Sequence, residues 1–224
     1  MLLVTATPVR PGPLDADVAL WLVDLAADDD ALTAAEARLT PVEVARAHRG
    51  TPAVHRRRVL LRAALRSALG SELGIPPGQV PIGTSPAGRP HLAVRGSLLD
   101  VSCSASGAVG VVAVGRGRRV GVDVELVAPW SSDVLDEGWL SPGERRALTG
   151  LPVTARPLAV TRCWTQKEAV LKATGTGLRA DPATVVTPVG RATGAVAGWE
   201  IRDVQVPDGW VASLAVTPEE ETPR

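Results

Sequence analysis

The sequence predicts an α+β protein made of two pseudo-symmetric halves, in each of which a long helix packs on a small antiparallel sheet. Two similar helix starts support this prediction: Leu39-Thr40-Pro41-Val42-Glu43 and Leu140-Ser141-Pro142-Gly143-Glu144. Each has Thr or Ser as N-cap, Pro at the first helical position and Glu at the third, which is typical of a capping box. The two caps lie 101 residues apart (141 − 40), which indicates an internal duplication.

The segments after the two caps predict the remaining parts of each half. Each cap is followed by an Arg-rich helix start, a Pro-bearing break and a longer helix, expected over roughly 54–73 and roughly 157–174. We therefore predict two domains, residues 1–117 and residues 118–224. Chance similarity between two ordinary helix caps is the alternative explanation.

Short apolar, β-branched segments bounded by Gly, Ser or Asp predict the strands. They are expected at residues 18–25, 98–104, 108–114, 120–126, 185–186, 199–206 and 210–216. Residues 115–119 predict the turn before the fourth of these strands, and Pro207-Asp208-Gly209 predicts the turn before the last. The polar, acidic tail from Pro218 is expected to fray.

Composition argues against several classes of protein. The 224 residues are 45% hydrophobic, enough for a core, and the formal net charge of zero does not indicate nucleic acid or an acidic membrane as partner. Cys103 and Cys163 lie far apart and indicate reduced thiols in a cytoplasmic protein rather than a disulfide scaffold. Residues 1–13 lack the pattern of a signal peptide, and no apolar run approaches the ~18 residues of a membrane span.

Two acidic side chains are expected on one face of the strand at 120–126. Alternate strand residues share a face, so the valines of Val120-Gly121-Val122-Asp123-Val124-Glu125 point to the core while Asp123 and Glu125 point the other way. Mg²⁺ takes one or two carboxylates and completes its shell with water and phosphate oxygens, so this face is a candidate site for a hard cation. A solvated strand edge is the alternative.

The segment Trp164-Thr165-Gln166-Lys167-Glu168-Ala169-Val170-Leu171-Lys172 predicts a second group of charged side chains, on the later long helix. Glu168 and Lys172 are four residues apart and share a helical face, and Lys167 lies beside that face. These two lysines are the only ones among 24 Lys and Arg residues, which suggests a need for a compact point charge. Glu168 is a candidate metal ligand or proton acceptor and Lys172 a candidate phosphate partner; an ordinary surface ion pair is the alternative.

Other chemistry finds no support in the sequence. Gly175-Thr176-Gly177-Leu178-Arg179-Ala180 matches a dinucleotide fingerprint in its letters, but it follows a helix instead of a strand. His48, His55 and His91 have no spacing typical of metal ligands, and no nucleophile elbow is present. The sequence thus predicts neither a histidine-bound metal nor a serine hydrolase.

The strand and helix motifs together resemble the paired signature of 4′-phosphopantetheinyl transferases, a strand Gly-x-Asp-x-Glu and a helix Trp-Ser/Thr-x-Lys-Glu-Ala-x-x-Lys. Over roughly 15–217 the chain resembles the two-halved, Sfp-type subfamily, with further matches at His55-Arg56, Gly88-Arg89-Pro90 and Val101-Ser102-Cys103-Ser104. The length fits this duplicated form rather than the short trimeric one, so a monomer is expected. Cys103 departs from the family, which usually has a histidine there that helps to hold the 3′-phosphate of coenzyme A.

The resemblance implies an active site in the cleft between the halves, with Mg²⁺ as cofactor and coenzyme A as co-substrate. Asp123, Glu125 and Glu168 would hold the metal, and the metal and Lys172 would stabilise the departing 3′,5′-ADP. Glu168, directly or through a metal-bound water, would be the general base. Arginine suits phosphate because its planar fork matches the oxygens. The residues expected to contact coenzyme A are Arg49, Arg56, Arg89, Pro90, Ser102, Cys103, Asp123, Lys167 and Lys172, with Arg46 as a further candidate.

The implied function is transfer of the 4′-phosphopantetheine arm of coenzyme A to a serine of an acyl or peptidyl carrier protein, for polyketide or nonribosomal peptide synthesis. Neither nucleic acid nor a membrane is expected as partner. A non-catalytic module that binds coenzyme A or a carrier protein is one alternative, although the charged residues of both motifs are present. An unrelated Mg²⁺-dependent nuclease or nucleotidyl transferase is another, against which the neutral net charge argues.

Overall fold

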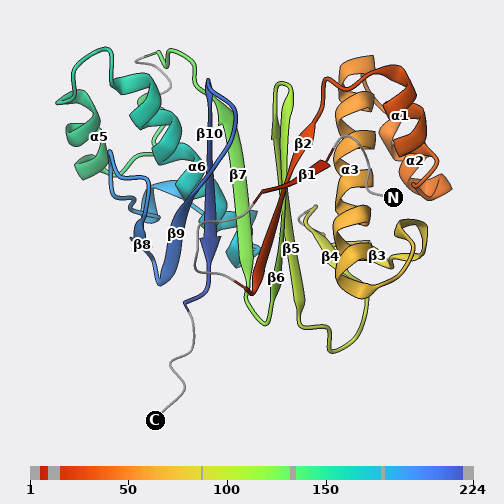
Figure 1. The fold of residues 1–224 in the computed structure, drawn as a ribbon. Coiled ribbons are helices and arrows are strands. Elements are labelled where there is room, and N and C mark those ends of the chain that lie inside the picture. The colour runs from red at the N-terminus through yellow and green to blue at the C-terminus, as the bar shows by residue number, and fades with distance from the viewer. Residues whose placement is uncertain (1–5, 10–15, 87, 132–134, 178–179, 219–224) are drawn as a thin grey trace, which may run out of the picture.

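The computed structural model of the chain describes residues 6–9, 16–86, 88–131, 135–177 and 180–218. Two four-stranded antiparallel sheets lie in the middle of the molecule, with the helices on the outside (Figure 1). The first sheet has the order β1 (Ala6–Val9), β2 (Val18–Asp24), β6 (Val109–Arg116) and β5 (Leu99–Ser106). The second has the order β7 (Val120–Leu126), β10 (Trp210–Val216), β9 (Trp199–Val204) and β8 (Gly194–Val196).

The helices divide into two sets, one beside each sheet (Figure 1). Beside the first sheet lie α1 (Asp29–Glu36), α2 (Pro41–Ala47) and α3 (Pro52–Leu73). Beside the second lie α5 (Pro142–Thr149) and α6 (Arg156–Thr174). Each long helix is followed by a 3₁₀ turn, η1 (Pro77–Gln79) or η3 (Pro182–Thr184), and η1 leads into the hairpin of β3 (Ile82–Thr84) and β4 (Pro90–Leu92).

The predicted fold class is confirmed, and so are both capping boxes. In α2 and in α5 the N-cap hydroxyl accepts from the Glu amide while the Glu carboxylate accepts from the N-cap amide. The strand predicted at 185–186 is wrong: Val185 ends η3 and packs against α6, because two apolar residues are too few to establish a ladder. β8 is the fourth strand of that sheet instead. The tail beyond residue 218 lies outside the described residues.

The two sheets have the same strand connectivity. In the first, β2 is followed by helices and then by β5 and β6, of which β6 lies next to β2. In the second, β7 is followed by helices and then by β9 and β10, of which β10 lies next to β7. β2 and β7 start 102 residues apart (120 − 18). The boundary at 117/118 falls in the turn between β6 and β7, and division into two domains stays a prediction.

Apolar clusters join the layers into one body. α3 packs on one face of the first sheet, and α6 packs on one face of the second. The remaining faces share a cluster that includes residues of β2, β6, β7 and β10. Burial of apolar surface is the main favourable contribution to folding, so this shared cluster holds the two halves together. Within the described residues, no helix combines the length and the apolar character needed to cross a bilayer.

Side chains of β5 also join the sheets, because they accept hydrogen bonds from the main chain of β7. Asp100 Oδ2 accepts from the Val120 amide at 2.9 Å, and Ser102 Oγ accepts from the Val122 amide at 3.1 Å. Ser106 Oγ accepts from the Leu126 amide at 3.1 Å. These acceptors occupy alternate positions of β5, so one face of that strand satisfies the otherwise unpaired edge of β7.

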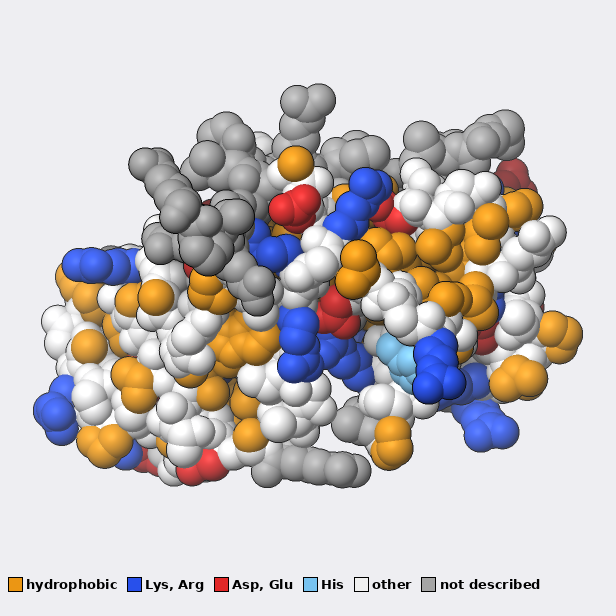
Figure 2. Space-filling model, turned by 90° about the horizontal axis from the view of Figure 1, so that it is seen from below, with side chains coloured by type: hydrophobic (Ala, Val, Ile, Leu, Met, Phe, Trp, Pro, Cys, Tyr) orange, Lys and Arg blue, Asp and Glu red, His pale blue; other side chains and the backbone are white. Residues whose placement is uncertain are grey.

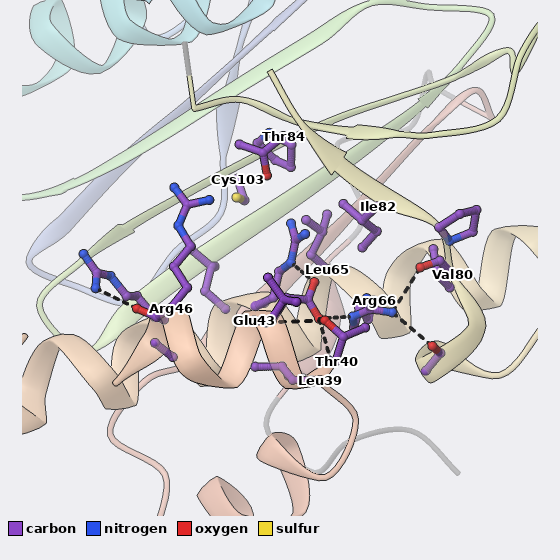
Figure 3. A pocket seen from close by; sticks show the side chains of 18 of the residues that line it. Leu39, Thr40, Glu43, Arg46, Leu65, Arg66, Val80, Ile82, Thr84 and Cys103 are labelled. Carbon is purple, nitrogen blue, oxygen red and sulfur yellow. Dashed lines mark hydrogen bonds and ion pairs between the residues drawn. The ribbon is translucent and has the colours of Figure 1, made fainter. Parts of the chain in front are cut away.

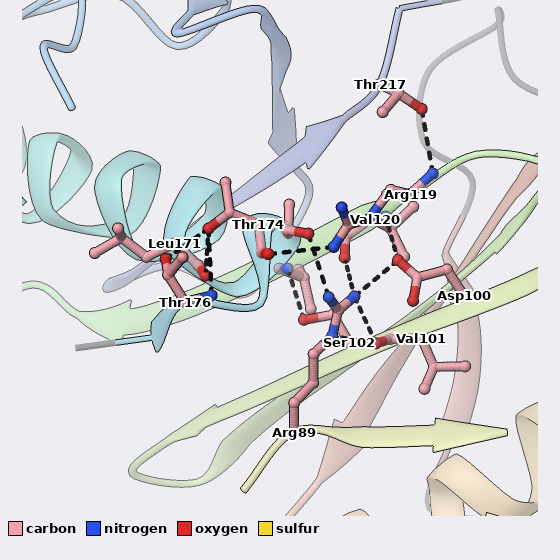
Figure 4. Close-up of polar contacts among 12 residues, drawn as sticks. Arg89, Asp100, Val101, Ser102, Arg119, Val120, Leu171, Thr174, Thr176 and Thr217 are labelled. Atoms are coloured by element: carbon pink, nitrogen blue, oxygen red, sulfur yellow. Dashed lines mark hydrogen bonds and ion pairs between the residues drawn. The ribbon is translucent and has the colours of Figure 1, made fainter. Parts of the chain in front are cut away.

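Arg89 makes a further connection between the halves (Figure 4). Its guanidinium donates to Asp100 Oδ2 at 2.7 Å, to the Val120 carbonyl at 2.9 Å and to the Ala173 carbonyl at 3.2 Å. The lower face of the molecule carries a group of Lys and Arg side chains in its middle, between the two sets of helices (Figure 2).

Gly121 allows α6 to approach β7 closely. A Cβ atom at this position would lie 2.0 Å from the Ala169 carbonyl oxygen and 2.5 Å from the Ala173 amide nitrogen. Real side chains do not reach such distances, so any larger residue would push the helix away from the strand. The close approach sets Glu168 and Lys172 over the face of β7 that carries Asp123.

Candidate active site

Asp123 and Glu125 lie on the face of β7 that α6 covers. Val120, Val122 and Val124 are fully buried in the shared cluster, as the alternation predicts. Asp123 on the opposite face is only 3% exposed. The alternative interpretation of this face as a solvated strand edge is therefore wrong.

Both strand carboxylates accept hydrogen bonds from serines of β5. Asp123 Oδ1 accepts from Ser104 Oγ at 2.7 Å and from Lys172 Nζ at 2.6 Å. Its Oδ2 is buried without a partner among the residues that the structure describes. Glu125 Oε2 accepts from Ser106 Oγ at 2.7 Å. The two carboxylates are thus fixed in position, and one of their oxygens remains unsatisfied.

Glu168 joins these carboxylates from α6. Its Oε1 is buried and has no partner in the described ranges of the chain. Burial raises the pKa of Glu168, and the negative charges of Asp123 and Glu125 raise it further. Burial also raises the pKa of Glu125, to which the charge of Asp123 adds. This mutual repulsion indicates that the three carboxylates converge, although their oxygens do not all lie within 4.8 Å of one another.

Lys172 provides the positive charge closest to this group. Its ammonium pairs with Asp123, and it donates to Ser104 Oγ at 2.8 Å. The alternative of an ordinary surface ion pair between Glu168 and Lys172 is therefore wrong, because Lys172 pairs with Asp123 of β7 instead. The side chain is 26% exposed, so the ammonium remains within reach of a ligand.

Lys167 does not face the site, which corrects its prediction as a coenzyme A contact. Its side chain is fully buried. The ammonium donates to Glu144 Oε2 at 2.8 Å, the Pro182 carbonyl at 2.9 Å and the Val185 carbonyl at 2.6 Å. An ammonium has three N–H donors, so none remains for a phosphate.

A cavity of about 550 Å³ lies between α2, α3 and the β3–β4 hairpin (Figure 3). Cys103 and Thr84 lie on one side of it, and Arg46 lies on the other (Figure 3). Pro90 belongs to the lining, which includes four arginines: Arg46, Arg58, Arg62 and Arg66. Burial raises the pKa of the Cys103 thiol, so the group is neutral and supplies no charge to a ligand.

The other expected coenzyme A contacts do not line this cavity. The Arg56 guanidinium pairs with Asp29 and donates to the Ala27 carbonyl, which corrects its prediction as a phosphate contact. Arg49 is exposed and does not line the cavity. Arg89 and Ser102 make the connections between the halves described above.

Sequence reasoning missed Arg57, Ser104 and Ser106. The charge of Arg57 lowers the pKa of Glu125, whereas the Arg56 guanidinium pairs with Asp29, so Arg57 is the one of the two that acts on this carboxylate. The serines follow from the alternation Asp100, Ser102, Ser104, Ser106 on β5, a run of small polar side chains on one face. That pattern was available in the sequence, whereas the choice between two adjacent arginines was not.

Comparison with known proteins agrees with this arrangement. The profile of the 4′-phosphopantetheinyl transferase superfamily matches residues 119–202, which include β7 and α6. The 4′-phosphopantetheinyl transferase HetI of Nostoc sp. is 34% identical over 212 residues, 91% of this chain and 89% of its own. The protein slr0495 of Synechocystis sp., whose name assigns the same activity provisionally, is 31% identical over 146 residues, 64% of this chain and 59% of its own.

The chain belongs to the 4′-phosphopantetheinyl transferase family. Enzymes of this family transfer the phosphopantetheine arm of coenzyme A to carrier proteins. The two-halved architecture agrees with the Sfp-type subfamily that the motifs resemble.

Proposed function

We propose that this chain transfers 4′-phosphopantetheine from coenzyme A to a serine hydroxyl of an acyl or peptidyl carrier protein, with Mg²⁺ held by Asp123, Glu125 and Glu168. Two buried carboxylate oxygens without partners, on Asp123 and Glu168, carry this proposal. A buried polar oxygen without a partner is costly, and a bound cation removes that cost. Polyketide or nonribosomal peptide synthesis is the proposed setting, and the cytoplasm the proposed location.

The carboxylate group fits Mg²⁺ by its donors. All three candidate ligands offer oxygen, which is the ligand atom that Mg²⁺ prefers, and Mg²⁺ leaves other positions to water and substrate phosphates. The raised pKa values of Glu125 and Glu168 arise from burial and from mutual repulsion, both of which a divalent cation opposes. When bound, Mg²⁺ would neutralise charge on the pyrophosphate of coenzyme A.

The cavity beside α2 and α3 supports a place for the adenosine end of coenzyme A. Its volume of about 550 Å³ and its apolar lining suit an adenine ring. Its arginines suit phosphate oxygens. Arg62 pairs with Glu43, whereas Arg46 has no carboxylate partner among the described residues. We therefore assign Arg46 the 3′-phosphate, with Pro90 and Cys103 as apolar contacts and Arg57 beside the pyrophosphate.

Glu168 is the proposed base for the reaction. The serine Oγ of the carrier attacks the phosphorus on the pantetheine side, its proton goes to Glu168, and the bond from that phosphorus to the bridging oxygen breaks. The leaving group is 3′,5′-ADP. The buried Oε1 of Glu168, which has no partner among the described residues, is the atom that would take this proton. Lys172, next to Asp123, stabilises the negative charge that grows on the leaving group.

Mass spectrometry of carrier proteins tests the function directly. Apo acyl and peptidyl carrier proteins are incubated with this chain, coenzyme A and Mg²⁺, and a gain of one phosphopantetheine per carrier is expected. Chelation of the metal should stop the gain, and added Mg²⁺ should restore it. Coenzyme A binding without a gain on any carrier would support the non-catalytic module instead.

A further inference from the structure

Two histidines and a glutamate meet where α1, α2 and α3 come together. Glu36 is the last residue of α1, His48 is the C-cap of α2, and His55 lies in the first turn of α3. None of them belongs to the carboxylate group or lines the cavity. Their separation in sequence gave no indication of a metal site.

The corner between α2 and α3 brings the two histidines together. α2 ends at His48, the chain reverses through Gly50, whose φ of 139° is one that glycine tolerates best, and Thr51 caps the start of α3. The imidazole rings of His48 and His55 consequently stack, with centroids 4.4 Å apart and planes inclined by 19°.

Glu36 lies against both rings at distances longer than hydrogen bonds. Glu36 Oε1 is 3.4 Å from His48 Nε2, and Glu36 Oε2 is 3.7 Å from His55 Nε2. His55 Nε2 is buried and has no hydrogen-bond partner within the described part of the chain. One ligand atom from each of the three residues lies within 4.8 Å of the other two. Two nitrogens and a carboxylate oxygen therefore converge while a buried nitrogen stays unsatisfied.

We propose that Glu36, His48 and His55 bind a divalent transition-metal ion of the zinc class, with water in the fourth position. Zinc–nitrogen and zinc–oxygen bonds of about 2.0–2.2 Å place neighbouring ligand atoms of a tetrahedron roughly 3.3–3.5 Å apart. The 3.4 Å between Glu36 Oε1 and His48 Nε2 meets this requirement, and the other carboxylate oxygen, Oε2, lies 3.7 Å from His55 Nε2, so the carboxylate reaches both rings. The His48 side chain is 58% exposed and therefore has room to tilt its ring toward the ion.

The donor set separates this site from the carboxylate group. Imidazole nitrogen suits Zn²⁺, Cu²⁺ and Ni²⁺, whereas Mg²⁺ prefers oxygen alone. An ion held here would tie the end of α2 to α1 and α3. Because α2 also carries Arg46 at the wall of the cavity, such an ion would fix one side of that cavity.

Competition for Zn²⁺ with a chromophoric chelator tests the site on untagged full-length protein, with excess Mg²⁺ present to occupy the carboxylate group. One Zn²⁺ per chain is expected. His48→Ala, His55→Ala and Glu36→Gln should each weaken Zn²⁺ binding at least about tenfold. Replacing a residue that only hydrogen-bonds a metal ligand already lowers metal affinity by about 10–100-fold. His91→Ala is the matched control, because His91 is an exposed histidine on β4 and should leave the affinity unchanged.

Two measurements distinguish loss of the metal site from misfolding of the variant protein. Circular dichroism without metal should show the same fold in His48→Ala as in the wild type, since this ring is largely exposed. Co²⁺ should give the absorption of a tetrahedral site in the wild type and lose it in His48→Ala. Zn²⁺ affinity that is equal in the wild type and in the folded His48→Ala and His55→Ala proteins, or absent in all of them, would overturn the proposal.

Discussion

The two halves of the molecule share one arrangement, called the latch below, in which a glutamate and its cationic partner join a short helix, a long helix and a 3₁₀ turn. In the first half the capping-box Glu43 pairs with Arg66, which donates to the carbonyls of Pro77 at 2.8 Å and Val80 at 3.0 Å. In the second half the equivalent residues are Glu144 and Lys167, which donates to the carbonyls of Pro182 and Val185. Glu43 and Glu144, like Arg66 and Lys167, are 101 residues apart (144 − 43 and 167 − 66).

The halves differ in what they place on the equivalent surfaces. β2 has the buried Trp21 and Val23 where β7 has Asp123 and Glu125, each pair 102 residues apart (123 − 21 and 125 − 23). α3 has Ser67 and Ser71 where α6 has Glu168 and Lys172, each pair 101 residues apart (168 − 67 and 172 − 71). Both halves therefore keep the latch, whereas at these compared positions the charged side chains belong to the second half.

The sharpest test of this asymmetry is Asp123→Asn. The substitution keeps the shape of the side chain but removes the charge that pairs with Lys172. We expect kcat/KM for carrier modification to fall by about 10³-fold or more, which is about 4 kcal/mol of transition-state stabilisation. Trp21→Phe, at the equivalent position of β2, is the matched control and should retain most of the turnover. Near wild-type activity of Asp123→Asn would remove this residue from the mechanism.

The two latches should differ in their sensitivity to loss of the cation. Lys167→Met leaves Glu144 buried without its charge partner, and we expect a loss of about 3–5 kcal/mol in the free energy of unfolding. Arg66→Met should cost less, about 2 kcal/mol, because Glu43 keeps its pair with Arg62. Urea denaturation measures both values. Equal losses would show that the second arginine contributes nothing to the first latch.

Acid should weaken both latches in the same pH range. Burial would raise the pKa of both glutamates, but the hydrogen bonds with Arg66, Thr40 and Arg62 lower that of Glu43 to about 2, and those with Lys167, Thr187 and Ser141 lower that of Glu144 to about 2. A depressed folded-state pKa stabilises the fold above the unfolded value near 4.5, and this stability disappears as the pH falls from about 4.5 to about 2.

Each latch glutamate should contribute on the order of 3 kcal/mol at neutral pH from this difference in pKa. Urea titrations at a series of pH values measure the effect. Glu43→Gln and Glu144→Gln should each remove part of the dependence between about pH 4.5 and about pH 2. An unchanged slope in either variant would contradict the depressed pKa of that glutamate.

We expect the first half to contribute to the reaction through Arg57 and not through the adjacent Arg56. Arg57 acts on the charge of Glu125, whereas Arg56 is engaged with α1. We expect Arg57→Ala to raise KM for coenzyme A about tenfold, corresponding to ~1.4 kcal/mol. Arg56→Ala is the matched control and should change stability more than KM. The reverse pattern would return Arg56 to the site.

The smallest expected effect concerns Glu168, whose pKa is raised, whereas the pKa values of the two latch glutamates are lowered. A carboxyl whose pKa is higher in the folded than in the unfolded state destabilises the fold as the pH rises above its unfolded-state pKa. The reason is that this carboxyl ionises more readily in the unfolded chain. Glu168→Gln should therefore stabilise the metal-free protein at neutral pH, as urea denaturation would show. Added Mg²⁺ should raise the Tm of the wild type more than that of the variant. A destabilised variant would indicate a structural role for Glu168.

Local patterns predicted much of this fold and part of the site. The capping boxes, the long helices and the strands β2, β7 and β10 were predictable because periodicity and caps act within a few residues. The alternation of β7 also identified the two strand carboxylates. Short elements such as β8 were missed, because a three-residue strand has too little pattern of its own and depends on its neighbour β9.

The sequence by itself determined where the capped helices, the long helices and the longer strands lie, which residues of β7 face the core, and to which family the motifs point. The tertiary structure decided which cation serves which acid. Successive residues of a helix point about 100° apart, and the partners of Lys172 and Lys167 lie 49 and 23 residues away in the chain. Only the packing of α6 on β7 and beside α5 therefore turns Lys172 toward Asp123 and Lys167 into the latch.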